Sequence, residues 1–165
     1  MTTPSGPAFA GDHIHIHIAE RAGAAMREQP NAELIPDVGI RGDRYATGLG
    51  HYSHRRDIRE VTLIEIETLE ALQRDHGITL RPHQQRRNLT TRGVPLNHLV
   101  GRTFSVGDTV LLGGRLNTPC TYLEDLLDIK VHKPLIHRSG LNCTIISGGI
   151  IQPGDPIAPT SDTPN

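Results

Sequence analysis

The sequence has few aromatic residues, few cysteines and no long apolar run. Aromatic residues make up 3% of the 165 positions, and tryptophan is absent. Proteins that bind single-stranded nucleic acid stack its bases on aromatic side chains, so this function is disfavoured. The two cysteines, Cys120 and Cys143, are too few for a disulfide framework. No run of about 18 apolar residues is present, and we therefore expect no membrane-spanning helix.

The charge balance lacks an excess of either sign. Lys and Arg together number 17 and Asp and Glu number 18, which gives a formal net charge of −1. Neither a basic field that would attract nucleic acid nor an acidic block is therefore present. The first residues show no charged start followed by an apolar segment, so we predict no signal peptide. A cytoplasmic protein with reduced thiols is the expectation.

Short apolar runs punctuated by glycine indicate a mainly β fold. We predict strands at 61–64, 103–112 and 141–147, with alternation in the last one placing Cys143 in the core. Gly113-Gly114 is predicted to form a turn. Residues 21–33 tolerate a helix without being clearly amphipathic.

One amphipathic helix is clear, and a second short one is indicated from Tyr122 onward. Ile66, Leu69 and Leu72 recur at spacings of three, and Gly77 stands where a helix commonly ends. Many short strands with one or two short capping helices predict a closed β-barrel or a sandwich. We expect one domain at 12–157, a loose leader at 1–11 and a disordered tail at 158–165.

Histidine alternates with isoleucine over residues 12–20. This period of two predicts a strand whose isoleucine face is buried and whose histidine face is exposed. The histidines are His13, His15 and His17. Imidazoles in such a row can chelate a metal ion. A half-exposed strand without metal is the favoured interpretation, and the metal site stays open as the alternative.

Residues with reactive or anion-binding side chains stand at both ends of segment 86–123. Arg86, Arg87 and Asn88 begin it, and Thr118-Pro119-Cys120 lies near its end. Guanidinium groups bind phosphate bidentately, and an amide can hold a polar ring edge. Spacing alone favours a solvated basic turn for the arginines, and a buried structural role for Cys120 is equally open.

Two upstream loops are further candidates for ligand contacts. In segment 39–45, two closely spaced glycines precede Arg44, so either a tight turn or an anion contact through Arg41 or Arg44 is possible. Segment 48–59 is rich in His and Arg. His51 and His54 are candidate acid–base groups there, although such loop residues are more often solvated.

The ordered set of motifs resembles the MOSC family, named for the C-terminal domain of molybdenum cofactor sulfurases. The central motifs are RRNLTTRGVPL at 86–96, LVGRTF at 99–104, VGD at 106–108 and Pro119-Cys120. The flanking motifs are GIRGDRY at 39–45, HRSGL at 137–141 and GIIQPGD at 149–155. The resemblance extends over most of the chain, which looks like a small standalone member. Two departures are Asn117, where some relatives have a second cysteine, and Ser139, where glycine is frequent.

The resemblance implies a strand-rich barrel in which Cys120 is the reactive cysteine. Cys120 would then ligate molybdenum in a pyranopterin cofactor or carry sulfur as a persulfide. The implied cofactor-binding residues are Arg86, Arg87, Asn88, Thr118, Pro119 and Arg44. A thiolate suits a metal that already has dithiolene ligands.

Three functions follow as hypotheses. The first is a molybdenum cofactor enzyme that reduces N-hydroxylated compounds and draws electrons from a separate reductase. The second is a sulfur carrier, supplied by a separate pyridoxal-phosphate cysteine desulfurase. The third is a binding module without turnover, in which Cys120 is structural. All three act on small molecules and involve neither nucleic acid nor a membrane.

Overall fold

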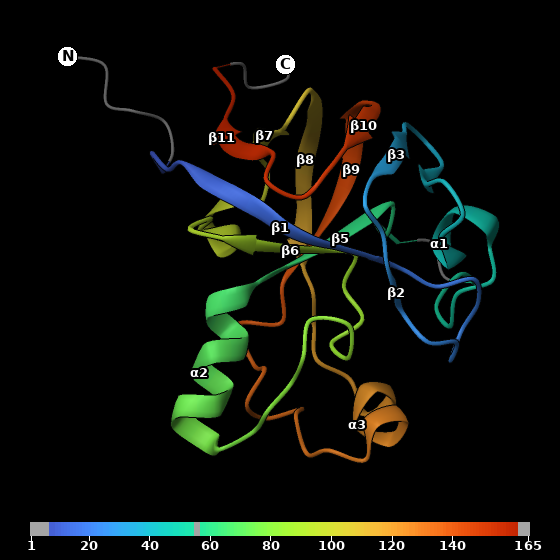
Figure 1. Ribbon diagram of the computed structural model, residues 1–165, viewed down its shortest axis with the longest axis vertical. Coiled ribbons are helices and arrows are strands. Elements are labelled where there is room, and N and C mark those ends of the chain that lie inside the picture. Colours follow the sequence, from blue (N-terminus) through green and yellow to red (C-terminus); the bar gives the residue numbers. More distant parts are fainter. Residues whose placement is uncertain (1–6, 55–56, 162–165) are drawn as a thin grey trace.

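Seven strands of the computed structural model form a closed barrel, which confirms the predicted mainly β fold (Figure 1). The structure describes residues 7–54 and 57–161. Around the barrel the strands follow the order β1 (Gly11–Ile18), β11 (Pro156–Pro159), β7 (Thr103–Val106), β8 (Thr109–Leu116), β9 (Leu141–Ser147), β5 (Val61–Glu65) and β6 (Leu89–Arg92). The pairing of β1 with both β6 and β11 closes the ring.

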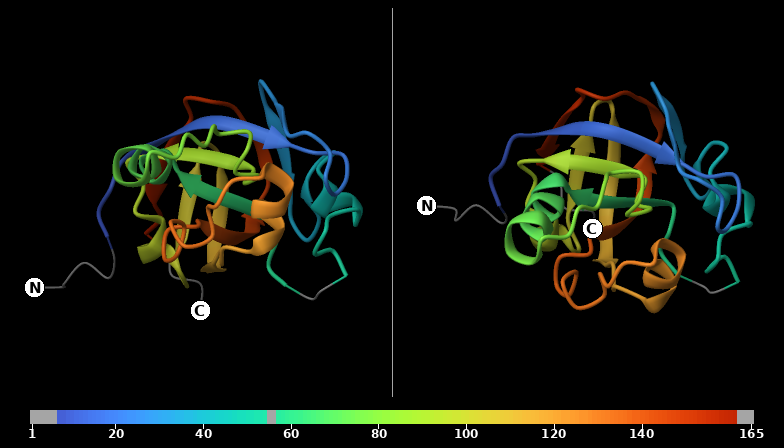
Figure 2. Two further views of the ribbon diagram at one scale, coloured as in Figure 1. Left: turned by 90° about the horizontal axis from the view of Figure 1, so that it is seen from below. Right: turned by 60° about the horizontal axis from the view of Figure 1, so that its bottom comes forward.

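The direction of each pairing follows from the connections. Strands β5 and β6 are parallel, because helix α2 (Ile66–His76) and the loop after it return the chain to the start of the sheet. The other barrel pairs are antiparallel. In the tilted view of Figure 2, the strands enclose the interior while α2 and α3 (Thr121–Leu127) lie outside at the same end.

The barrel interior is filled by aliphatic side chains, because the sequence supplies few aromatics. Phe104 is fully buried there among the isoleucines, leucines and valines of the inner faces. A second buried cluster joins Ile64 of β5 to α2 and α3, through residues that include Leu72, Leu123 and Leu135. This second cluster anchors α3, and therefore the adjacent Cys120, against the barrel.

The predicted helix is confirmed as α2, and its C-cap Gly77 has a φ of 66° in the left-handed region. The second helix indicated by the sequence is α3. A single turn, α1 (Arg44–Thr47), and a 3₁₀ turn at Leu96–Leu99 are present in addition. No helix in residues 7–54 and 57–161 is long and apolar enough to cross a membrane.

Residues 21–33 form no helix, although their sequence tolerates one. They contain the short strand β2 (Arg27–Glu28), which extends the barrel sheet beside β1, and the start of β3 (Ala32–Ile35). Strand β3 pairs with β4 (Gly39–Ile40) and β10 (Gly149–Ile151) in a small second sheet. Pro30 interrupts any helix between the two strands, and pairing with distant strands overrides the weak helical tendency.

The predicted turn at Gly113-Gly114 is wrong, since both glycines lie inside β8. A Cβ at Gly113 would stand 2.0 Å from the carbonyl oxygen of Leu99, and one at Gly114 would stand 2.5 Å from the side chain of Ile58. Glycine is therefore required there by close neighbours. The pairing of β8 with β9 shifts register between Gly113 and Arg115, and this bulge redirects Arg115.

The prediction of an exposed histidine face on β1 is also wrong. His13 is 0% exposed and His17 is 3% exposed, whereas only Ile16 among the alternating isoleucines is fully buried. A register shift between His13 and His15 breaks the alternation, and neighbouring segments cover the outer face of the strand. Burial lowers the pKa of both His13 and His17. Within the described residues, no group of three or more His, Cys, Asp or Glu side chains is arranged to hold a metal ion.

Strand pairing begins at Gly11 and continues through Pro159. It thus extends one residue before and two residues beyond the predicted domain of 12–157. Residues 1–6 and 162–165 of the predicted leader and tail lie outside the described residues. The division into leader, domain and tail stays a prediction.

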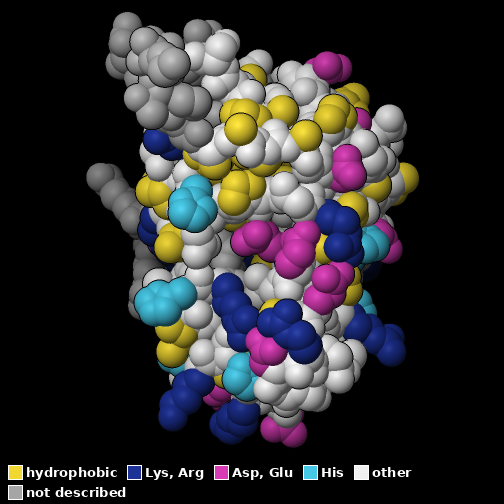
Figure 3. All heavy atoms as spheres, turned by 90° about the vertical axis from the view of Figure 1, so that its left-hand side faces the viewer, with side chains coloured by type: hydrophobic (Ala, Val, Ile, Leu, Met, Phe, Trp, Pro, Cys, Tyr) yellow, Lys and Arg dark blue, Asp and Glu magenta, His cyan; other side chains and the backbone are white. Residues whose placement is uncertain are grey.

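The face that carries α2 has charges of both signs. In Figure 3, acidic and basic side chains are interspersed over the lower half of this face, where α2 lies. Arg74 pairs with Asp75, and Arg92 pairs with Glu70, with all four side chains exposed. This surface therefore has no concentrated positive charge, unlike the pocket at α3.

Candidate functional site

A pocket of about 270 Å³ lies between α1, α3, the loop after α1 and the ends of β5 and β8. This volume is slightly below the range of about 300–1,000 Å³ that is common for small-molecule sites. Its lining includes five of the predicted site residues: Arg44, Arg86, Arg87, Thr118 and Cys120. The structure thus brings together side chains from segments that are far apart in the sequence.

Positive charge dominates the pocket. Among the described residues, five arginines line it (Arg44, Arg59, Arg86, Arg87 and Arg115), and Asp57 is the one lining carboxylate. The neutral overall charge of the chain therefore conceals a strongly basic cavity. Such a cavity attracts anions, because its low-dielectric walls focus the field of the guanidinium groups.

Arg87 is buried without a carboxylate partner among the described residues. Its side chain is bound by neutral acceptors: Nε donates to the carbonyl oxygen of Ser139 (3.0 Å) and Nη1 to that of Gln85 (2.6 Å). Nη2 donates to Asn117 Oδ1 (2.7 Å) and Ser139 Oγ (2.5 Å). Burial lowers the pKa of Arg87 to about 10, partly opposed by the neighbouring Cys120. At neutral pH the guanidinium is therefore a fixed, uncompensated charge.

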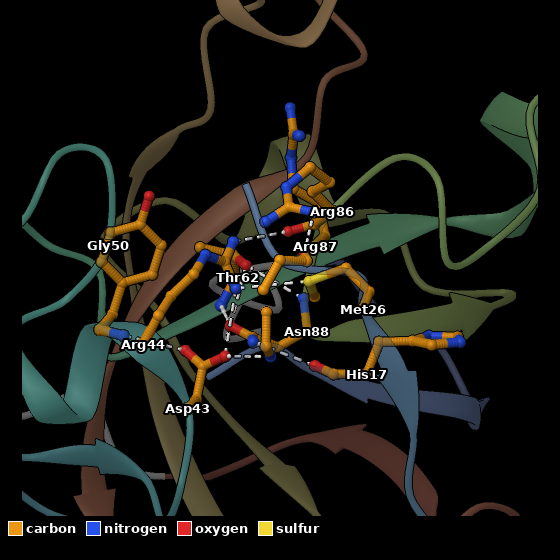
Figure 4. A network of polar contacts seen from close by, with 12 residues as sticks. His17, Met26, Asp43, Arg44, Gly50, Thr62, Arg86, Arg87 and Asn88 are labelled. Atoms are coloured by element: carbon orange, nitrogen blue, oxygen red, sulfur yellow. Dashed lines mark hydrogen bonds and ion pairs between the residues drawn. The ribbon is translucent and has the colours of Figure 1, made fainter. Parts of the chain in front are cut away.

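Arg44 and Arg86 form the adjoining wall (Figure 4). Arg44 Nη1 pairs with Asp43 (3.1 Å), whose carboxylate also caps α1, and Arg44 Nη2 donates to the carbonyl oxygen of Arg86 (3.1 Å). Arg86 Nη1 donates to the carbonyl oxygen of Ala24 (2.7 Å). No carboxylate in the described chain pairs with Arg86, so it adds a second uncompensated charge to that of Arg87.

Arg59 and Arg115 share the carboxylate of Asp57. Arg115 binds it through both Nε (2.8 Å) and Nη2, and Arg59 Nη2 donates to it at 2.9 Å. The hydrogen bonds from Arg115 have the largest effect and, with the charge of Arg59, lower the pKa of Asp57 to about 2. This group therefore keeps one net positive charge at neutral pH.

Cys120 is partly buried at the pocket wall, immediately before α3. Tyr52 forms a side-chain hydrogen bond with Cys120, and burial together with this contact raises the pKa of Tyr52 to about 12. Arg115, which also lines the pocket, is engaged by Asp57. Cys120 thus interacts with the phenol of Tyr52 and the buried charge of Arg87, and it also packs against the second hydrophobic cluster.

All three tyrosines of the chain line the pocket: Tyr45, Tyr52 and Tyr122. His51 stacks on Tyr122 with ring centroids 3.8 Å apart and an interplanar angle of 6°. Arg59 lies over the ring of Tyr52 at 4.6 Å. These aromatic side chains were not predicted to be part of the site. Tyrosine is rare in this chain, so the presence of all three tyrosines in one pocket marks the site only once the fold is known.

Asn88 and Pro119 do not line the pocket. Asn88 is fully buried, and its Oδ1 accepts from the backbone N–H (3.1 Å) and Oγ1 (3.0 Å) of Thr62. Its Nδ2 donates to the carbonyl oxygen of His17 at 3.2 Å, so it connects three barrel strands beneath the pocket (Figure 4). Of the loop candidates, His51 reaches the pocket, whereas Arg41 pairs with Glu33 on the surface.

The fold and the site together define a closed β-barrel protein with a thiol and several arginines in one lateral pocket. Within that class, the chain belongs to the MOSC family, because the model of the MOSC domain matches residues 50–158. None of the curated proteins compared with the chain matches it.

Solved structures share the fold. The YuaD protein from Bacillus subtilis superimposes with a TM-score of 0.78 at 17% identity, covering 92% of this chain and 96% of that protein. YiiM from Geobacillus stearothermophilus has a TM-score of 0.70 at 13% identity, with 92% and 75% of the two chains covered. YiiM from Escherichia coli has a TM-score of 0.65 at 16% identity, with coverages of 96% and 72%. At these identities the likeness shows the fold alone.

Proposed function

We propose that this protein binds the molybdenum cofactor in the pocket, with Cys120 as the protein ligand to molybdenum. The single observation that carries the proposal is the meeting of a thiol with uncompensated buried arginines. Burying unpaired charge is costly, so a pocket that retains Arg86 and Arg87 without carboxylate partners is suited to an anionic occupant. Membership in the MOSC family supports a pyranopterin with a phosphate as that occupant.

The residues present fit the parts of such a cofactor. A soft cysteine thiolate is a suitable ligand for a metal with dithiolene sulfur. Arg86 and the Arg59–Asp57–Arg115 group have donors for phosphate oxygens at the wall. Tyr122 and His51 present flat rings beside which a planar heterocycle can pack. When bound, molybdenum would supply two-electron redox chemistry.

The chain's own residues would bind and orient the occupant. Arg87 would hold negative charge near the sulfur, and Tyr52 would contribute a hydrogen bond to Sγ. Reduction of an N-hydroxylated compound at this site would require electrons from a separate reductase partner. The alternative is a sulfur carrier, in which Cys120 receives a persulfide sulfur from a pyridoxal-phosphate cysteine desulfurase. The same thiol and arginines serve that role, so the two are separated by experiment.

The test is the molybdenum and pterin content of protein purified from a host that makes the cofactor. Wild type would be compared with Cys120→Ser and with Cys143→Ala, a matched change of the other cysteine. We expect near-stoichiometric molybdenum and pterin in wild type and in Cys143→Ala, and neither in Cys120→Ser. Metal analysis and fluorescence of the oxidised pterin provide the two measurements.

Other outcomes would replace the proposal. A chain without molybdenum, but with one added sulfur atom on Cys120 by mass spectrometry, would be assigned as the sulfur carrier. If the protein contains neither molybdenum nor an added sulfur atom, the remaining hypothesis is a binding module without turnover. Molybdenum retained in Cys120→Ser would refute the ligand role of this residue.

A further inference from the structure

Asn117 occupies the position that decides whether the charge of Arg87 is neutralised. Its Oδ1 accepts a hydrogen bond from Arg87 Nη2 at 2.7 Å, and Asn117, Arg87 and Cys120 all line the pocket. A carboxylate oxygen in the same place would form an ion pair with Arg87. The amide supplies the hydrogen bond but no negative charge.

The other acceptors of Arg87 are neutral as well. They are the carbonyl oxygens of Gln85 and Ser139 and the hydroxyl of Ser139. A guanidinium has five N–H groups, and four of them are accounted for by these contacts and Asn117. The hydrogen bonds therefore fix the orientation of Arg87 while leaving its charge uncancelled. An unpaired buried cation costs stability, and a carboxylate partner or an apolar replacement would remove that cost. Stability alone therefore does not explain the presence of Arg87.

We propose that Asn117 is a positioning residue that holds Arg87 while keeping its charge available, and that it thereby selects anionic over neutral molecules beside Cys120. The inference rests on the proposed function, since it takes Cys120 as the reacting group. It names a requirement for the occupant: net negative charge close to the sulfur. Ser139 shares the holding role through its hydroxyl and carbonyl oxygens.

Asn117→Asp is the substitution that isolates charge from shape. The carboxylate keeps the acceptor for Arg87 but loses the Nδ2 donor to Asn142 Oδ1, which is a 2.8 Å contact. Asn142 Nδ2 is buried without a partner in the described residues, so a flip of that amide would restore a hydrogen bond to the new carboxylate. We therefore expect the variant to fold.

The measurement compares alkylation of Cys120 by iodoacetate and by iodoacetamide. In both reactions the thiolate sulfur attacks the methylene carbon, a C–S bond forms, and the C–I bond breaks with release of iodide. Both require the thiolate, so the ratio of the two rates cancels any difference in its fraction. The ratio, normalised to that of N-acetylcysteinamide, which carries no charge beside its thiol, reports the local charge. Peptide mass spectrometry identifies the labelled cysteine.

We expect the normalised ratio in wild type to favour iodoacetate by about tenfold, and Asn117→Asp to remove most of this preference. Asn31→Asp, the same change at an exposed position outside the pocket, should leave the ratio within about twofold of wild type. Asn117→Leu removes one acceptor of Arg87 without adding charge, so it should retain more of the preference than Asn117→Asp, because Gln85 and Ser139 still hold the guanidinium. The melting temperature of Asn117→Asp should be no lower than that of wild type, since a buried cation gains a partner.

Several results would overturn the inference. These are a wild type without preference for iodoacetate, an unchanged ratio in Asn117→Asp, and an equal loss in Asn117→Leu. If Asn117→Asp fails to fold, Ser139→Asp places a carboxylate against the same guanidinium, and failure of both to fold would also count against the inference. Cofactor content is measured independently. If the protein contains molybdenum but its Cys120 does not prefer iodoacetate, only the inference about Asn117 is refuted. If Cys120 prefers iodoacetate but the protein contains no molybdenum, only the proposed cofactor role is refuted.

Discussion

The two cysteines lie in regions of opposite electrostatic character: one is apolar and the other is rich in positive charge. Cys143 is fully buried on β9 inside the aliphatic barrel, where burial alone raises the pKa of its thiol. Cys120 lies at the edge of a pocket that, in the part of the chain the structure describes, is lined by five arginines and one carboxylate. The barrel interior excludes charge and provides stability, whereas the pocket is built from loops and strand ends that the barrel holds in place.

This difference also separates structural from functional asparagines. Asn88 satisfies backbone and hydroxyl groups of neighbouring strands and has no contact with the pocket lumen. Asn117 uses its amide on a guanidinium that faces the site. The same residue type therefore stabilises the fold in one region and adjusts electrostatics in the other.

The largest expected effect is on thiol labelling. In the native protein, iodoacetamide should modify Cys120 at least about a hundredfold faster than Cys143, because a buried thiol with a raised pKa reacts only on opening. Mass spectrometry of digested protein gives both rates. Comparable rates in native protein, with equal labelling again in urea, would contradict the contrast between the two regions.

Next in size is the loss of the asparagine that connects the strands. Asn88→Ala should lower the free energy of unfolding by about 3 kcal/mol, because it leaves the Thr62 N–H and the His17 carbonyl without their partner. Urea titration followed by circular dichroism measures the change. Thr118→Ala, at an exposed position on the pocket wall, should stay within about 0.5 kcal/mol of wild type. If Asn88→Ala and Thr118→Ala are equally stable, Asn88 does not have the structural role assigned to it.

Serine substitutions sharpen the comparison of the cysteines. Cys143→Ser should cost about 2 kcal/mol, since a hydroxyl enters an aliphatic core without an acceptor. Cys120→Ser should cost less, about 0.5 kcal/mol, because Cys120 is only partly buried and lies where the second hydrophobic cluster meets the polar pocket. The same urea titration applies. Equal destabilisation by both would assign Cys120 to the core and end its role as a reactive thiol.

The smallest expected effect is the loss of folding stability at low pH that comes from His13 on β1. Burial lowers the pKa of His13 in the folded state below its ordinary value of 6.5. The unfolded chain therefore binds more protons below about pH 6.5, so the contribution of His13 is complete above that pH and is lost as the pH falls. Wild type should lose stability relative to His13→Gln between about pH 7.5 and 5.5, by less than about 1 kcal/mol. If the stabilities of the two proteins change in parallel with pH, or if wild type gains stability relative to His13→Gln on acidification, the assignment of a lowered pKa to His13 is wrong.

Sequence patterns predicted the elements whose signals are local. The spacing of Ile66, Leu69 and Leu72 and the position of Gly77 predicted α2, and alternation placed Cys143 in the core. The patterns failed where tertiary contacts override them. Gly113 and Gly114 are glycines because other segments approach β8, and His13 is buried because segments distant in sequence cover β1.

The candidate site was predictable in part. The motifs around Arg87 and Cys120 pointed to residues that do share a pocket, whereas Asn88 was assigned to the ligand and lies beneath the site. The aromatic walls were not predicted. Nothing local marks Tyr52 or Tyr122 as neighbours, because they meet only when the loop after α1 folds against α3.

By itself, the sequence determined the secondary-structure elements with strong periodicity, the barrel class and the family, because backbone preferences and motif order are written along the chain. Only the tertiary structure decided which charges are buried and which are compensated. Arg87 and Asn117 are thirty positions apart, and they come into contact although two strands, β9 and β5, lie between β8 and β6 in the sheet. Burial and pairing of charge depend on such distant neighbours, so no local pattern can specify them.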